Sequence, residues 1–213
     1  GITSGIPGAL SVVRDLAGSA EARRVGREVG YPGWSPDGPT DIPVQSWSLA
    51  DRPVVMNMVL PWRRPTIAVA LADGVGEIDT ASVFEVYAES AAARTLAVSP
   101  TGVVETAHGL RLLTLTEHEA SDVGTVLRPG ALGPRGRPGF DGALEHLAQT
   151  AGAATARSAA TMIDYPTEGL DLGDGTGPRR TQVLGAAALG LALGVGLVPW
   201  VRRRQRPRAT RRS

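Results

Sequence analysis

Two carboxylates, Glu77 and Asp79, belong to a residue type that can hold or transfer a proton. They follow residues 66–72, an uncharged apolar run of strand length that ends at an Asp-Gly turn pair. A run that is apolar on both faces suits a strand buried in a parallel sheet, and residues 80–93 then repeat apolar side chains at helical spacing. The sequence therefore predicts a strand, an acidic loop and a helix. Asp79 is placed where it would cap this helix.

Other catalytic groups are scarce in the sequence. The 213 residues contain no cysteine, which excludes disulfides, thiolate metal sites and cysteine nucleophiles within them. His108, His118 and His146 have no partner at the short spacing of a metal-binding motif, so we expect ordinary histidines and no metal site. Nothing in the sequence indicates a cofactor.

The segments on either side of these carboxylates follow an α/β pattern. Residues 94–98 and 123–130 are predicted to be further strands, and residues 103–106 and 110–115 a two-stranded ribbon. Strands that alternate with helices of this length are typical of βαβ units. We therefore expect an α/β fold with a mostly parallel, incomplete sheet.

These residues resemble the ThiJ/PfpI family, whose members are related to class I glutamine amidotransferases and include isonitrile hydratases. Four short motifs carry the resemblance, in the family's order: Ala72-Asp-Gly-Val-Gly-Glu-Ile-Asp79, Phe84-Glu-Val86, Val98-Ser-Pro-Thr-Gly102 and Pro129-Gly130. The resemblance implies a flavodoxin-like fold in which an acid at the end of the first strand lies beside a cysteine nucleophile. Asp79 occupies the position of that acid, and Glu77 is the neighbouring alternative.

The chain departs from this family where the nucleophile belongs. Only eight residues, 131–138, rich in Gly, Pro and Arg, precede the next predicted helix. Such a segment forms a loop and is too short for the family's helix, strand and nucleophile elbow. No Gly-x-Ser-x-Gly elbow replaces it elsewhere. We therefore expect a truncated domain with a degenerate active site.

An internal repeat relates two distant segments. Residues 5–32 and 139–166 align without a gap at an offset of 134 residues, with eleven identities. Each copy is predicted to form two helices separated by a glycine, Gly18 or Gly152, and each ends at a Tyr-Pro pair. The resemblance implies that this helix pair closes a ThiJ/PfpI domain. The alternative is a duplicated amphipathic hairpin that packs against itself.

These features divide the chain into six segments. They are the closing helix pair of a first domain (1–38), a Pro/Gly-rich linker (39–65), a truncated ThiJ/PfpI-like domain (66–170), a spacer (171–180), a transmembrane helix (181–201) and a basic tail (202–213). Within the linker, residues 53–61 are suited to an edge strand, and Trp47 and Trp62 have no helical spacing.

The predicted transmembrane helix contains nineteen residues without charge, 183–201. As a helix they would span about 28 Å, close to the ~30 Å thickness of the hydrocarbon core of a bilayer. A buried soluble helix is the alternative, but one this long and this apolar all round is uncommon. The predicted anchor residues are Arg179, Arg180, Trp200, Arg202, Arg203 and Arg204, and Gly190 and Gly194 offer a close-approach face to another helix.

Charge is segregated along the chain, although the net charge is only +1. All 22 basic residues are arginines, and seven of them lie in the last twelve residues. This excess predicts a single-pass protein of the cytoplasmic membrane, with its C-terminal tail in the cytoplasm and its folded domain outside. Contact with anionic lipid explains the basic charge of the tail more simply than nucleic-acid binding does, because no nucleic-acid-binding motif accompanies the tail.

Two functions are open at this point. The first is a membrane-anchored, catalytically degenerate ThiJ/PfpI-like module that binds or senses an unknown small molecule. The second is the C-terminal part of a membrane-tethered isonitrile-hydratase or amidotransferase-like enzyme whose nucleophile lies upstream of Gly1. The expected partners are the lipid bilayer, a small molecule, and a second copy of the chain or a tandem domain.

Overall fold

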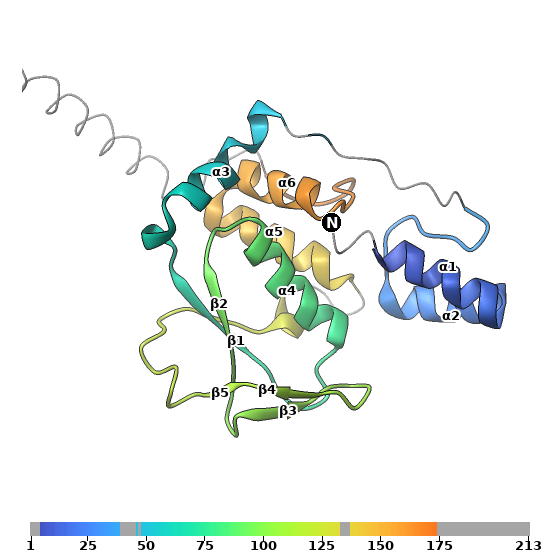
Figure 1. The fold of residues 1–213 in the computed structure, drawn as a ribbon, viewed down its shortest axis with the longest axis horizontal. Helices are drawn as coiled ribbons and strands as arrows, with labels where there is room; N and C mark the ends of the chain where they lie inside the picture. The colour runs from blue at the N-terminus through green and yellow to red at the C-terminus, as the bar shows by residue number, and fades with distance from the viewer. Residues whose placement is uncertain (1–4, 39–45, 47, 133–136, 174–213) are drawn as a thin grey trace, which may run out of the picture. The chain divides into compact units, whose positions relative to one another are not determined.

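The computed structural model describes residues 5–38, 46, 48–132 and 137–173. Within them, helices pack with a parallel sheet as in an α/β protein (Figure 1). The helices are α1 (Gly5–Ala17), α2 (Ser19–Val29), α3 (Arg52–Val59), α4 (Glu77–Glu89), α5 (Gly139–Ala151) and α6 (Ala153–Met162), with the 3-10 helices η1 (Leu49–Asp51), η2 (Pro61–Arg63) and η3 (Pro129–Ala131). The strands are β1 (Thr66–Ala70), β2 (Arg94–Ser99), β3 (Val103–Glu105), β4 (Arg111–Leu113), β5 (Leu115–Thr116) and β6 (Val126–Leu127).

A parallel sheet of four strands, in the order β5-β2-β1-β6, organises the fold. β1 pairs with β2 on one side, in a register that sets Val69 opposite Ala97, and with β6 on the other. β2 pairs with β5 in the same direction. The three middle residues of β1 are buried, as its uncharged apolar sequence predicts. The expected α/β class with a parallel sheet is confirmed.

A small antiparallel ribbon, β3–β4, is separate from this sheet. Val103 pairs with Leu113, and the turn between the strands contains Gly109, whose φ of 84° suits a residue without a Cβ. The predicted two-stranded ribbon is confirmed. The ribbon is bonded to the loop after β1, because the Gly74 N–H donates to the Glu105 carbonyl oxygen at 2.8 Å.

The hydrophobic core joins the sheet to α4, α5 and α6. Its fully buried side chains include Val69 of β1, Val83 and Val86 of α4, and Leu144 and Leu147 of α5. Burial of each such side chain contributes about 1.5–3 kcal/mol relative to exposure. The core therefore fixes α4 and α5 relative to the end of β1.

The segment expected as an irregular linker contains helices. Residues 53–61, expected as an edge strand, are mostly helical, because α3 runs through them and packs against α6. Pro53 lies in the first turn of α3, where its missing N–H costs nothing. Ser48 and Asp51 form a reciprocal capping box just before it. The expectation of irregular structure with an edge strand is therefore wrong for residues 49–59 and 61–63, which form helices.

The predicted repeat is present as two helix pairs, α1–α2 and α5–α6. Gly18 and Gly152 hold equivalent positions between the helices, both with positive φ (86° and 94°), and each N–H bonds the carbonyl four residues earlier at 2.9 Å. Gly30 and Asp164 are equivalent at the ends of the pairs, and both are left-handed (φ 68° and 53°). The repeat therefore extends from the sequence to the backbone conformation.

Several predictions fall on residues 174–213, which lie outside the described residues. They are the transmembrane helix 181–201, the basic tail 202–213, the anchor residues Arg179, Arg180, Trp200, Arg202, Arg203 and Arg204, and the helix-packing residues Gly190 and Gly194. In the part of the chain that the structure describes, no helix is long and apolar enough to cross a bilayer.

Candidate functional site

Asp79 lies in the first turn of α4, shortly after the carboxyl end of β1. The helix begins at Glu77 and not near Thr80, so the predicted acidic loop is wrong and both carboxylates are helical. Gly76 is the N-cap, and no side chain caps the helix there. The predicted capping role of Asp79 is therefore also wrong. The helix dipole favours acidic side chains in the first turn of a helix. The spacing of apolar residues, from which the helix start near Thr80 was predicted, does not report this preference.

The Asp79 carboxyl group is half-buried, and it accepts no hydrogen bond from the residues that the structure describes. Burial raises its pKa above the ordinary value, because the charged form loses contact with water. Since none of the described residues bonds this carboxyl group, it can form hydrogen bonds to a ligand.

Two glycines let α5 approach Asp79 and the residue after η3. A Cβ at Gly139 would lie 2.8 Å from Asp79 Oδ1 and 2.8 Å from Ser82 Oγ. A Cβ at Gly142 would lie 2.6 Å from the carbonyl oxygen of Leu132. Side chains do not fit at such distances, so glycine at both positions permits the close packing. The Asp79 side chain, on the first turn of α4, therefore packs against Gly139, the first residue of α5.

No activated nucleophile accompanies Asp79 in the described part of the chain. Ser82 is fully buried, and its hydroxyl donates to the backbone carbonyl of Asp79 at 2.8 Å. Thr80 is also buried, and its hydroxyl has no hydrogen-bond partner there, so no base activates it. Residues 133–136 lie outside the described residues, and their sequence contains no Cys, Ser or Thr. Among the described residues, Asp79 is therefore an acid without a neighbouring group that it could activate for attack.

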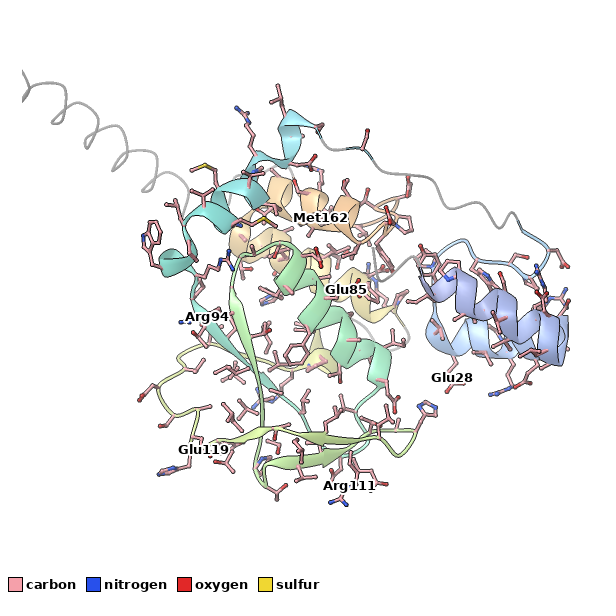
Figure 2. All side chains as sticks on the ribbon, viewed as in Figure 1. Glu28, Glu85, Arg94, Arg111, Glu119 and Met162 are labelled. Atoms are coloured by element: carbon pink, nitrogen blue, oxygen red, sulfur yellow. The ribbon has the colours of Figure 1, made fainter. Side chains whose placement is uncertain are left out.

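Glu77, the alternative acid, is bound by the turn of the β3–β4 ribbon. Its carboxylate accepts the backbone N–H of His108 at 2.9 Å and lies 2.7 Å from His108 Nδ1. The other ring nitrogen, Nε2, lies 2.9 Å from a carboxylate oxygen of Glu28 in α2. Figure 2 shows Glu28 on the side of α2 that is nearest to the ribbon. His108 therefore bridges carboxylates from two elements that are distant in the sequence.

The two candidate acids differ in their proton affinity. Hydrogen bonds from the Thr106 hydroxyl and from His108 lower the pKa of Glu77 to about 2. The pKa of His108 is raised in turn, first by Glu77 and then by Glu28. A carboxylate held so firmly in its charged form is a poor proton carrier near neutral pH. Glu77 therefore serves the fold, and Asp79 is the better candidate for a ligand contact.

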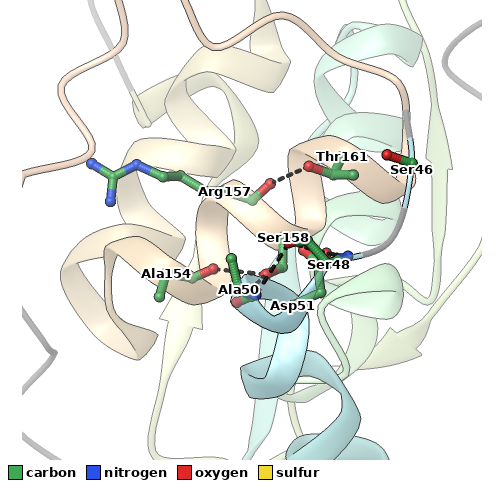
Figure 3. Close-up of a pocket in the computed structure, with 8 residues that line it drawn as sticks. All are labelled: Ser46, Ser48, Ala50, Asp51, Ala154, Arg157, Ser158 and Thr161. Carbon is green, nitrogen blue, oxygen red and sulfur yellow. Dashed lines mark hydrogen bonds between the residues drawn. The ribbon is translucent and has the colours of Figure 1, made fainter. Parts of the chain in front are cut away.

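A separate cavity of about 360 Å³ lies between η1 and α6 (Figure 3). Its buried acid, Asp51, accepts the backbone N–H of Ser48 at 2.8 Å and its hydroxyl at 3.2 Å. Ser158 donates to the Ala154 carbonyl, so these lining groups are already satisfied and we assign no ligand. No expectation from the sequence placed a cavity here, although the Ser-x-x-Asp spacing of its capping box is visible in the sequence. Its lining residues are Ser46, Ser48, Ala50, Asp51, Ala154, Arg157, Ser158 and Thr161.

Of the predicted site residues, Asp79 and Glu77 lie in one helical turn but have different surroundings. No local pattern in the sequence links Gly139, His108 or Glu28 to these two carboxylates. The chain matches no protein-family model, no curated protein and no solved structure. A proposal of function therefore rests on the residues and geometry described above.

Proposed function

We propose that this chain is a membrane-anchored, catalytically degenerate α/β module that binds a small molecule at Asp79. The observation that carries the proposal is the half-buried Asp79 carboxyl group, which has no hydrogen-bond partner among the described residues. In open α/β sheets, ligands bind beyond the carboxyl ends of the strands, where Asp79 lies. An acid without a nucleophile at such a place suits binding rather than covalent catalysis.

In its finer form, the proposal is a flavodoxin-like domain of the ThiJ/PfpI kind. Support comes from the parallel β1–β2 pair and from the acid in the first helical turn after β1. A carboxyl group recognises hydrogen-bond donors, so the ligand class is a small amine or amide.

Membrane anchoring is proposed from the sequence of residues 181–213. The nineteen uncharged residues and the arginines on both sides of them support a span, and the seven arginines of the tail support a cytoplasmic C-terminus. The α/β unit would then bind its ligand on the outer side of the cytoplasmic membrane.

Nuclear magnetic resonance titration of residues 1–177 with small amines and amides tests the ligand site. This compact unit contains the whole described hydrophobic core. We expect shift changes at the start of α4 and of α5 that are lost in Asp79→Asn. Asp122→Asn is the matched control, because Asp122 is an exposed acid. Shift changes that persist in Asp79→Asn would contradict the proposal.

A second candidate is an enzyme whose nucleophile lies in a domain upstream of Gly1. It is favoured by a difference between the repeats: a Cβ at Gly5 or Gly8 would meet nothing within 4 Å, whereas their equivalents Gly139 and Gly142 are tightly packed. Among the described residues, the first helix pair thus lacks the α/β layer that the second pair covers. Isonitrile-hydratase or amidase activity of the protein expressed from its own start codon, abolished by thiol alkylation, would support this candidate.

A further inference from the structure

An exposed apolar face extends along α3 and η2. Its side chains are between 44% and 75% exposed, with Trp62 the most exposed. The other side of α3 is buried, because Pro53 and Val54 face the protein interior and α3 packs against α6. The face is formed by Val55, Met56, Met58, Val59 and Trp62.

The sequence that carries this face is basic. From position 52 to position 72 it contains three arginines and no Asp or Glu. Arg64 is fixed along α3, because its guanidinium group donates to the carbonyl oxygens of Asn57 (3.1 Å) and Met58 (3.4 Å). The positive charge of Arg64 is therefore held beside the apolar side chains.

A further arginine adjoins the same segment. The Arg94 N–H donates to the Pro65 carbonyl oxygen at 2.9 Å, and the Arg94 side chain is exposed. Figure 2 shows Arg94 at the start of β2, near the end of η2. Basic and apolar groups therefore lie together on this part of the surface, a combination that complements an anionic lipid surface.

The described chain ends beside the helix that supports this face. The Gly173 carbonyl oxygen accepts a hydrogen bond from Arg157 of α6 at 3.0 Å, and α6 is the helix against which α3 packs. Nine residues, 174–182, separate Gly173 from the apolar segment 183–201. Even fully extended, nine residues reach only about 30 Å. The apolar segment therefore begins within about 30 Å of Gly173, which is bonded to α6, the helix that supports the face.

We propose that the α3–η2 face binds an anionic lipid surface. Trp62 and the methionines enter the boundary between headgroups and acyl chains, and the arginines contact lipid phosphates. This inference rests on the proposed membrane anchoring and deepens it, because it gives the folded unit a fixed face toward the bilayer. Residues 1–177 lack the apolar segment, so lipid binding by this form tests the α3–η2 face separately from the membrane anchor.

Sedimentation of residues 1–177 with vesicles measures this contact directly. We expect binding to phosphatidylcholine vesicles that contain phosphatidylglycerol, weaker binding to phosphatidylcholine alone, and loss of binding as salt is raised. Trp62→Ser should lower the partition coefficient about tenfold. Leu113→Ser is the matched control, because Leu113 on β4 is 84% exposed and lies outside the face; it should leave the partition coefficient unchanged.

Fluorescence quenching by lipids brominated along the acyl chain gives a second measurement that does not depend on a stable Trp62→Ser variant. We expect quenching of the parent protein and its loss in Trp62→Phe. Absence of binding to anionic vesicles, equal binding to neutral vesicles, or an equal loss in Leu113→Ser would overturn the proposal. A dimer in solution that Trp62→Ser dissociates would also overturn it, and would identify the face as a contact between two copies of the chain.

Discussion

Tyr31 and Tyr165, which hold equivalent positions in the two sequence repeats, contact each other edge to face with ring centroids 5.8 Å apart. The Tyr31 hydroxyl also donates to the backbone carbonyl of Asp164 at 3.2 Å. Tyr165 stacks in turn on Phe140 at the start of α5, with ring centroids 5.2 Å apart. The Tyr-Pro ends of the two helix pairs therefore meet, and this contact joins α1–α2 to the core.

Gly8 and Gly142 are equivalent residues, and alanine should have opposite effects at the two positions. Gly142→Ala would set a Cβ 2.6 Å from the Leu132 carbonyl oxygen and should destabilise the unit by about 1–3 kcal/mol. Gly8→Ala meets open space in a helix and should stabilise it by up to about 1 kcal/mol. Urea unfolding measures both. Equal effects would show that the two helix pairs are packed alike, against the asymmetry described above.

The hydroxyl of Tyr165 should matter more for stability than that of Tyr31. Tyr165 is buried and donates to Asp141 Oδ1 at 2.7 Å, so Tyr165→Phe should cost about 1.5–3 kcal/mol. Tyr31 is only half-buried and donates to a neutral carbonyl, so Tyr31→Phe should cost about 0.5–1.5 kcal/mol. The midpoint and slope of urea unfolding curves give the free energy of unfolding of the two variants and of the parent. The reverse order would contradict the assigned hydrogen bonds.

Asp79→Asn should leave the unit as stable as the parent, or more stable, at pH 7. The folded state raises the Asp79 pKa above 3.8, so its charged form opposes folding at high pH and this effect disappears as the pH falls below that value. The stability difference between the variant and the parent should therefore shrink from pH 7 toward pH 3. Thermal melts across this range measure it. A variant that melts well below the parent at pH 7 would indicate a structural role for the carboxylate.

The pKa of His108 should lie above its ordinary value of 6.5. Glu77 has the larger effect, so Glu77→Gln should lower the His108 pKa more than Glu28→Gln does. Because folding raises this pKa, the contribution of His108 to stability is present below pH 6.5 and is lost as the pH rises through the folded-state pKa. Nuclear magnetic resonance titration of the imidazole reports it, with His146, whose pKa burial lowers, as an internal comparison. A His108 pKa that neither substitution changes would contradict the bridge.

Local sequence patterns correctly predicted β1 and the breaks within the helix pairs, because local residue preferences determine these features. The uncharged run of β1 and the glycine breaks of the helix pairs are visible in the sequence, because burial on both faces and a positive φ restrict residue type. Residues 53–61 were ambiguous, since a short apolar run suits a strand or a helix. The capping box of Ser48 and Asp51, directly before α3, is the local signal in this segment that favours a helix.

The candidate site was only partly predictable. The place of Asp79 after β1 follows from the order of elements, but its surroundings depend on α5, which lies sixty residues later in the chain. His108, in the turn between β3 and β4, bridges Glu28 of α2 and Glu77 of α4. No spacing in the sequence predicts such a long-range contact. Long-range packing therefore decided which carboxylate the fold uses.

Membrane fractionation shows whether residues 181–201 anchor the α/β module. The full chain and a form that ends at Gly177 are expressed in parallel, and the membranes are washed with alkaline carbonate to remove peripheral protein. We expect the full chain to stay in the washed membrane fraction and the shortened form to be released. Release of both forms, or retention of both, would contradict this expectation.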